Sequence, residues 1–494
     1  MLYYILSMAL GFVSRKVFID HLGADVLGLN STAQNLLGFL NLAELGIGSA
    51  IAFTLYKPLA QKDETTIKEI ITVQGWLYRR ISTFVAIGAI ILMCFFPLIF
   101  KGMELPMWYA YTSFGVYLYS SLLTYYTNYK QIILSANQEE YKITYHYKFV
   151  LLAQSLAQIL AISYLSNGYV WWLVIQFVFS SLAAWNLNRA IKKDYPFLKL
   201  KLSEGSLLSK KYPVIIQKVK QLFVHKFAGF VLTQTSSLII YAYTSLFMVA
   251  VYGNYMLIVN SITMMFTAIF NGVTAGVGNL VAEGEKKRIM SVFEELFSSR
   301  FLCVGTFAFC IYKLSSSFMT LWLGEKYVFD DLIVIEILII MYIALTRTTI
   351  DAFISAYGLF RDIWAPLVEA TLNITMSIAF GYYWGIKGIL FGVIISLLII
   401  VKGWKPYFVF KNAFHVSYSK YIYMYFKHIA AFALSCIICS YMYRFILKSD
   451  VKTYLDWTIN AGVVFITFSL CLYFTMYAFT PGIRLFTKRF IRTK

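Results

Sequence analysis

Long apolar segments recur along the whole chain, and they restrict its fold more than any other feature. A helix needs about 20 mostly apolar residues to cross the hydrocarbon layer of a bilayer, and the sequence predicts about 14 such helices. They cover approximately residues 2–20, 30–56, 77–100, 108–135, 146–165, 169–190, 223–249, 252–281, 292–313, 332–357, 363–383, 385–403, 421–444 and 457–479. The chain is therefore expected to be an all-α, polytopic membrane protein.

Composition supports lipid as the surrounding solvent. Hydrophobic residues make up 60% of the 494 residues and charged residues only 14%, whereas soluble domains carry about 25% charged residues. The pair Cys436 and Cys439 has no second pair or nearby histidine that would complete a zinc site. The sequence also contains no phosphate-binding loop, zinc-protease motif or nucleophile elbow. We therefore expect no enzyme, no catalytic residue, no metal site and no cofactor.

The basic residues cluster in alternate connections between the apolar segments. With the N-terminus in the cytoplasm, the connections richest in lysine and arginine all lie on the cytoplasmic side, at 57–68, 192–220, 286–288, 402–420 and 484–494. The opposite connections hold little beyond Lys101, Lys326, Lys387, Lys448 and Lys452. Cytoplasmic loops of membrane proteins are rich in such residues, so both termini are expected inside. This asymmetry explains much of the net charge of +19, and nucleic acid is not an expected partner.

The longest polar segment, near residues 191–220, divides the predicted helices into six before it and eight after it. This division predicts an N-terminal lobe of six helices at 1–190 and a cytoplasmic inter-lobe loop at 191–222. A second six-helix lobe follows at 223–403, and two additional helices with a basic cytoplasmic tail complete the chain at 404–494. Two bundles related by an axis along the membrane normal are typical of many transporters.

Several sequence stretches, in order, cover nearly the whole chain. They are GFVSRKVFIDHLGADVLGLN at 11–30, LAELGIGSAIAFTLYKPLAQKD at 42–63, VYGNYMLIVNSI at 251–262, NGVTAGVGNLVAEG at 271–284, YGLFRDIWAPLVEATLN at 357–373 and WGIKGILFGVIIS at 384–396. Together they resemble the Wzx-type polysaccharide-unit flippases. That family belongs to the MOP superfamily, which also holds the lipid II flippases and the MATE drug and cation antiporters.

The resemblance implies two six-helix lobes around a central cavity lined by cations. It implies that the chain flips oligosaccharide units, carried on polyprenyl pyrophosphate, across the bacterial cytoplasmic membrane for surface polysaccharide such as O-antigen or capsule. Alternating access, coupling to Na⁺ or H⁺, and a polysaccharide polymerase with its assembly proteins as partners are also implied. The chain departs from many relatives at Ser236 and Ser237, where they carry an acidic residue.

Cations within the apolar segments are the first candidates for binding an anionic head group. Arg15 lies in the first segment, and the resemblance matches it to an arginine that faces the cavity. Arginine can bind phosphate with two parallel hydrogen bonds, although Arg15 could instead extend to the headgroups. Lys16 lines the cavity or pairs with Asp20, four residues later.

Charged groups elsewhere in the segments are further candidates, because ionisable residues inside a membrane are often functional. Arg347 and Asp351 bind substrate or neutralise each other at a spacing of four residues. Glu44 pairs with Arg15, couples transport to a cation or holds two helices together. Glu369 contributes to coupling or pairs with Arg361 or another cation of a cytoplasmic connection. His225 and Lys226 meet the pyrophosphate as it enters from the cytoplasm, or they anchor a helix end.

Two other functions remain open. A MATE-type antiporter for drugs or cations would need carboxylates at membrane depth, and Glu44, Asp351 and Glu369 would serve. A membrane-embedded glycosyltransferase or polymerase would need a large extramembrane loop with catalytic carboxylates, and the predicted outside connections are short.

Overall fold

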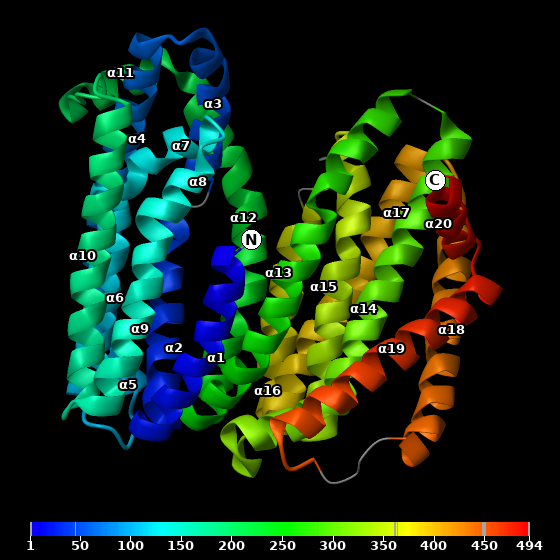
Figure 1. Ribbon diagram of the computed structural model, residues 1–494. Helices are drawn as coiled ribbons and strands as arrows, with labels where there is room; N and C mark the ends of the chain where they lie inside the picture. Colours follow the sequence, from blue (N-terminus) through cyan, green and yellow to red (C-terminus); the bar gives the residue numbers. More distant parts are fainter. Residues whose placement is uncertain are drawn as a thin grey trace. The chain divides into compact units, whose positions relative to one another are not determined.

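The computed structural model is a set of helices arranged in two compact units, Met1–Leu257 and Ile258–Lys494 (Figure 1). It describes residues 2–44, 46–283, 285–359, 362, 364–446 and 451–492, apart from the side chains at 2, 4, 43, 220–222, 224–234, 268–269, 271–275, 279, 282–283 and 490–492. No strand occurs in the part of the chain described. The prediction of an all-α membrane protein is confirmed, whereas the number of crossings and the lobe boundaries stay predictions.

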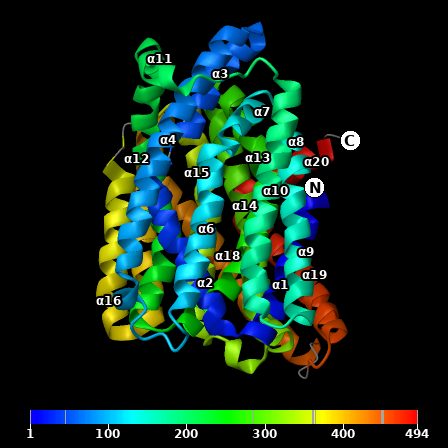
Figure 2. The ribbon, with the colours of Figure 1, turned by 90° about the vertical axis from the view of Figure 1, so that its left-hand side faces the viewer.

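Eight helices in the described ranges are long and apolar enough to cross a membrane. The first unit contains α1 (Leu2–Leu22), α2 (Ala24–Leu40), α3 (Ile47–Gln61), α4 (Glu64–Cys94), α5 (Phe96–Ile99), α6 (Trp108–Tyr126), α7 (Ile132–Ala136), α8 (Glu140–Ile143), α9 (Phe149–Tyr164), α10 (Gly168–Asp194), α11 (Gly205–Lys211), α12 (Pro213–Tyr243) and the first part of α13 (Leu246–Glu283). Helices α6, α9 and α10 lie side by side in this unit (Figure 2). Helix α1 packs against α9.

The predicted segment 30–56 is not one helix. Helix α2 ends at Leu40, the residues Asn41–Glu44 form a 3₁₀ turn, and α3 begins at Ile47. Gly46 has a φ of 93°, a left-handed conformation that residues other than glycine rarely adopt. The chain is therefore interrupted where the polar residues Asn41 and Glu44 lie.

The second unit contains the rest of α13, then α14 (Lys286–Leu323), α15 (Asp331–Ala356), α16 (Trp364–Leu397), α17 (Lys405–Val409), α18 (Tyr418–Ile446), α19 (Tyr454–Phe479) and α20 (Pro481–Arg492). Helix α14 packs against α15, α19 and α20. Their interior is rich in aromatic rings: Phe293 lies 5.4 Å from both Phe353 and Phe410, measured between ring centroids. Burying such rings is the main apolar contribution to this packing.

Two predicted helices meet at Gly385, inside α16. Gly385 has φ 57° and ψ −136°, and the hydroxyl of Ser377 donates to the carbonyl of Ile389 across the bend, at 3.0 Å. A Cβ on Gly388 would lie 2.0 Å from the carbonyl oxygen of Phe380, so only glycine permits this close approach. The tight junction predicted around Trp384 is therefore a real reversal of the chain.

Helical structure continues beyond the predicted end at residue 403. π-Helical turns at Leu398–Trp404 and Phe410–Phe414 extend α16 and α17 to Phe414. Lys402 and Lys405 are only 8% and 7% exposed. The sequence assigns these two lysines to a cytoplasmic connection, whereas the structure has them within helical turns, where their ammonium groups find polar partners on α15.

Candidate functional site

Arg15 packs against α13 within the first unit. A Cβ on Gly253 would lie 2.8 Å from Nη2 of Arg15, so the absence of a side chain at Gly253 makes room for the guanidinium. The Nε of Arg15 is buried and has no hydrogen-bond partner among the described residues. An arginine carries five N–H donors, and this one retains donor capacity for a ligand.

Asn254, the next residue of α13, was not predicted as a site residue. Its side chain is fully buried, and neither its Oδ1 nor its Nδ2 has a hydrogen-bond partner in the part of the chain described. A buried amide without partners is costly. Its signal in the sequence is a lone asparagine in the apolar stretch VYGNYM.

Lys16 lies on a different side of α1 from Arg15. It forms the ion pair with Asp20 that the sequence suggests. Its Nζ is 3.1 Å from Oδ1 of Asp20, and the two side chains are 40% and 44% exposed. Half-exposed pairs at this spacing contribute little to stability. The contact supports the structural interpretation of Lys16, and its part in a cavity stays a prediction.

Glu44 lies in the interrupted segment between α2 and α3 and accepts a hydrogen bond from the hydroxyl of Tyr78, at 2.8 Å. Nearby, Oδ1 of Asn41 accepts from the hydroxyls of Tyr125 and Ser121, at 2.8 and 3.0 Å. No ion pair joins Glu44 to Arg15 or to another described residue. The carboxylate is therefore held by the hydroxyl of Tyr78, and no cation pairs with it among the described residues.

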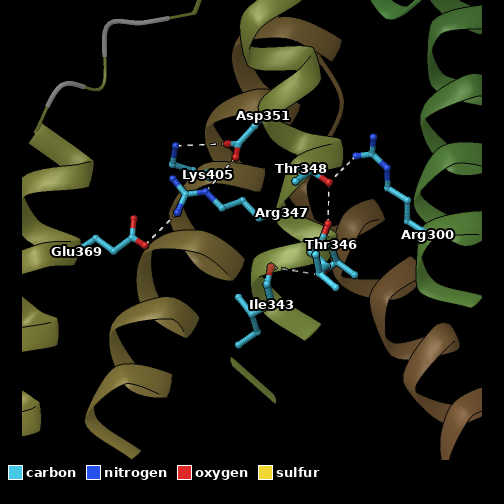
Figure 3. A network of polar contacts seen from close by, with 9 residues as sticks. Arg300, Ile343, Thr346, Arg347, Thr348, Asp351, Glu369 and Lys405 are labelled. Atoms are coloured by element: carbon cyan, nitrogen blue, oxygen red, sulfur yellow. Dashed lines mark hydrogen bonds and ion pairs between the residues drawn. The ribbon is translucent and has the colours of Figure 1, made fainter. Parts of the chain in front are cut away.

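The second unit contains an ion network around Arg347 (Figure 3). The Nε of Arg347 is 3.0 Å from Oδ2 of Asp351, and its Nη1 is 3.1 Å from Oε1 of Glu369. Lys405 adds a contact of 3.5 Å to Oδ1 of Asp351. The expected pair of Arg347 and Asp351 is present, and Glu369 joins it. The alternative partner of Glu369, Arg361, lies outside the described residues.

Two oxygen atoms next to this network have no described partner. Oε2 of Glu369 and Oδ1 of Asn373 are buried and unpaired among the described residues, and both side chains are 0% exposed. The residues are one helical turn apart on α16 and therefore lie on the same face. Two unpaired oxygens on one face are suited to bind a small cation or a water molecule.

Two more buried cations, Arg300 and Lys402, contact α15, and neither is a site residue predicted from the sequence. Arg300 donates from Nη1 to the hydroxyls of Thr348 and Thr349, at 2.8 and 3.1 Å. Its signal was a single arginine inside the apolar segment 292–313. Lys402 donates to the hydroxyl of Thr346 at 2.7 Å. No carboxylate in the described part of the chain forms an ion pair with either group.

The side chains of His225 and Lys226 lie outside the described residues, although both positions belong to α12. Their suggested contact with an entering pyrophosphate stays a prediction.

The fold has solved counterparts, whereas no family model and no curated protein matches the sequence. The lipid II flippase MurJ in an inward closed conformation superimposes with a TM-score of 0.64 at 13% identity, over 96% of this chain and 99% of MurJ. An inward-facing multidrug resistance MATE family transporter gives 0.62 at 12% identity, over 82% of this chain and 94% of that transporter. The chain has the fold of the MOP-superfamily transporters.

Proposed function

We propose that this protein flips oligosaccharide units linked to polyprenyl pyrophosphate across the bacterial cytoplasmic membrane, for synthesis of a surface polysaccharide. It does so as a transporter and not as an enzyme, by alternating access through a central cavity lined by cations. The observation that carries the proposal is the guanidinium of Arg15 on α1, which lies against Gly253 of α13 and has a buried Nε without a partner among the described residues. A pyrophosphate supplies the negative charge and the hydrogen-bond acceptors that the guanidinium of Arg15 needs.

The balance of charges in the second unit also favours an anionic substrate. Near one end of α15, Arg347 and Lys405 pair with the carboxylates of Asp351 and Glu369. Arg300 and Lys402 donate to threonine hydroxyls of the same helix and form no ion pair among the described residues. Charges at membrane depth are costly without a counterion. An excess of cations suits a pyrophosphate better than the cationic drugs of an antiporter.

An apolar pocket suits the other part of a lipid-linked substrate. A pocket of about 480 Å³ lies between α14, α15 and α18, and its lining is almost entirely aliphatic and aromatic. Tyr342 and Tyr425 belong to this lining, and their ring centroids are 4.8 and 5.1 Å from Nζ of Lys402. An apolar pocket with a cation at its edge suits an amphiphile with an anionic head.

Unpaired buried oxygens also suggest where a coupling ion binds. We propose that Na⁺ or H⁺ binds at the unpaired oxygens of Glu369 and Asn373, with the carboxylate of Glu44 as the candidate in the first unit. Both termini are proposed to lie in the cytoplasm, where a glycosyltransferase pathway supplies the substrate. A polymerase and its assembly proteins are the proposed partners on the opposite side.

The test is polymer export in a deletion strain complemented with variants. Arg15→Ala is expected to abolish surface polysaccharide, with lipid-linked units accumulating on the inner leaflet, while membrane levels of the protein stay normal. Lys16→Ala is the matched control, because Lys16 is adjacent but already paired with Asp20. Normal polysaccharide in the Arg15→Ala strain would rule out the role of Arg15. Drug resistance on expression, with no polysaccharide defect on deletion, would favour the MATE-type alternative.

A further inference from the structure

A second pocket of the second unit lies where α14 and α18 begin. Its volume is about 650 Å³. The side chains around it are of two kinds. Basic groups come from Lys286, Lys287, His415 and Lys420, and apolar groups include Ile289, Met290, Phe414 and Val416. The pocket therefore combines cations with an apolar lining.

The pocket holds more positive than negative charge. Among the described residues that line it, Glu294 is the only carboxylate, and its Oε1 is already 2.9 Å from Nζ of Lys420. Lys286 and Lys287 are exposed, and neither forms an ion pair with a described carboxylate. Two ammonium groups thus remain available to an anion that enters the pocket.

Aromatic side chains indicate that this end of the unit lies at the level of the lipid headgroups. The ring of Trp404 is 4.7 Å from Trp364 and 5.6 Å from Tyr407, and Tyr407 is 5.8 Å from Tyr418. Tryptophan and tyrosine concentrate at the two membrane–water interfaces. The pocket-lining residues Phe414 and Lys420 lie within a few residues of these rings.

The position of helix α20 also indicates that this end of the unit lies at the level of the lipid headgroups. It packs on α14 (Figure 1), with Ile483 fully buried and with Arg484, Lys488 and Arg489 exposed. Arg489 is 3.2 Å from Oε1 of Glu295, which is next to the pocket residue Glu294. A short helix with one apolar and one basic face is typical of a segment that lies in the membrane interface.

We propose that this pocket binds the headgroup of an anionic phospholipid. The phosphate would meet Lys286 and Lys287, and the first carbons of the lipid chains would contact Met290, Phe414 and Val416. A zwitterionic lipid carries a compensating cation that these lysines repel, so the site distinguishes phosphatidylglycerol from phosphatidylcholine. This assignment does not depend on the transported substrate, because it concerns a membrane lipid bound at the surface of the second unit.

The experiment measures lipid binding to the full-length protein by native mass spectrometry, in an equimolar mixture of phosphatidylglycerol and phosphatidylcholine. The wild type is expected to retain phosphatidylglycerol selectively. Each basic residue near an anionic surface is worth about five-fold in affinity, so the double variant Lys286→Gln/Lys287→Gln is expected to lose roughly 25-fold. The matched control is Lys192→Gln/Lys193→Gln, which removes two adjacent exposed lysines at the end of α10.

A third variant distinguishes lipid binding inside the pocket from general attraction of anionic lipids to a positively charged surface. Ser291 lines the pocket and is exposed, so Ser291→Trp fills the cavity without changing any charge. Loss of phosphatidylglycerol in this variant and in the double variant, with retention in the control pair, supports the proposal. Full retention in Ser291→Trp, or equal loss in the control pair, overturns it. Binding of inorganic phosphate at least as tight as that of phosphatidylglycerol would identify a free-phosphate site and would also overturn it.

Discussion

At the scale of single residues, the ion network of Arg347 shows which contacts a sequence can reveal. The pair with Asp351 follows from a spacing of four residues on one helix. Glu369 lies 22 residues away on another helix, and no local pattern connects it with Arg347. Packing of α15 against α16 creates that contact, whereas the sequence alone suggests the nearer cation Arg361 as the partner of Glu369.

The network makes a prediction about stability. Arg347→Met leaves the fully buried carboxylate of Glu369 without its guanidinium, and breaking a buried pair in this way costs about 3–5 kcal/mol. We expect a clear fall in the thermal unfolding temperature of the detergent-solubilised protein. The double variant Arg347→Met/Glu369→Gln removes both charges and should regain most of the loss. An Arg347→Met protein as stable as the wild type would show that this pair does not hold the unit together.

Gly253 provides a prediction about positioning. In Gly253→Ala the new methyl group would lie 2.8 Å from Nη2 of Arg15, so the guanidinium must move. We expect polysaccharide export to fall while the protein still accumulates in the membrane. Gly11→Ala is the control on the facing helix, because its methyl group would meet Leu257 at an ordinary 3.7 Å. Equal export by both variants would mean that the exact place of the guanidinium does not matter.

At the scale of helices, hydropathy located the apolar segments but not their interruptions. Segment 30–56 is mostly apolar, yet Gly46 and the 3₁₀ turn before it divide the segment. The opposite error occurs at Lys402 and Lys405, where charges suggested the end of a helix. Helical structure continues there because Thr346 accepts from Lys402 and Asp351 pairs with Lys405. These polar partners belong to another helix, so no local sequence pattern reveals them.

The reversal inside α16 can be tested through Gly385. Its φ of 57° and ψ of −136° lie close to a region that only glycine occupies readily, and a side chain there costs about 1–3 kcal/mol. We expect Gly385→Ala to lower the unfolding temperature. Gly462→Ala is the comparison, since a methyl group added at this exposed glycine of α19 would meet no atom within 4 Å, and alanine there favours the helix. Indistinguishable melting curves would contradict the strained turn.

At the scale of the whole molecule, the sequence predicted the class of fold and one part of the candidate site. Arg15 could be found because it is a strong charge in an apolar helix. The group of cations beside α15 could not, because Arg300 comes from α14 whereas Lys402 and Lys405 come from the helical stretch after α16. A sequence shows which charges enter the membrane, whereas only the packing shows which of them remain without a counterion.

The last prediction concerns topology, which rests on the distribution of lysine and arginine over all connections. Fusions of alkaline phosphatase, which is active only outside the cytoplasm, should be inactive after Lys211 and at the C-terminus. Fusions in the connections that hold Lys101 and Lys326 should be active. A green fluorescent protein series at the same four positions should give the reverse pattern and controls for expression. An active phosphatase at the C-terminus would require an odd number of crossings after an internal N-terminus. It would contradict the predicted count of about 14 crossings.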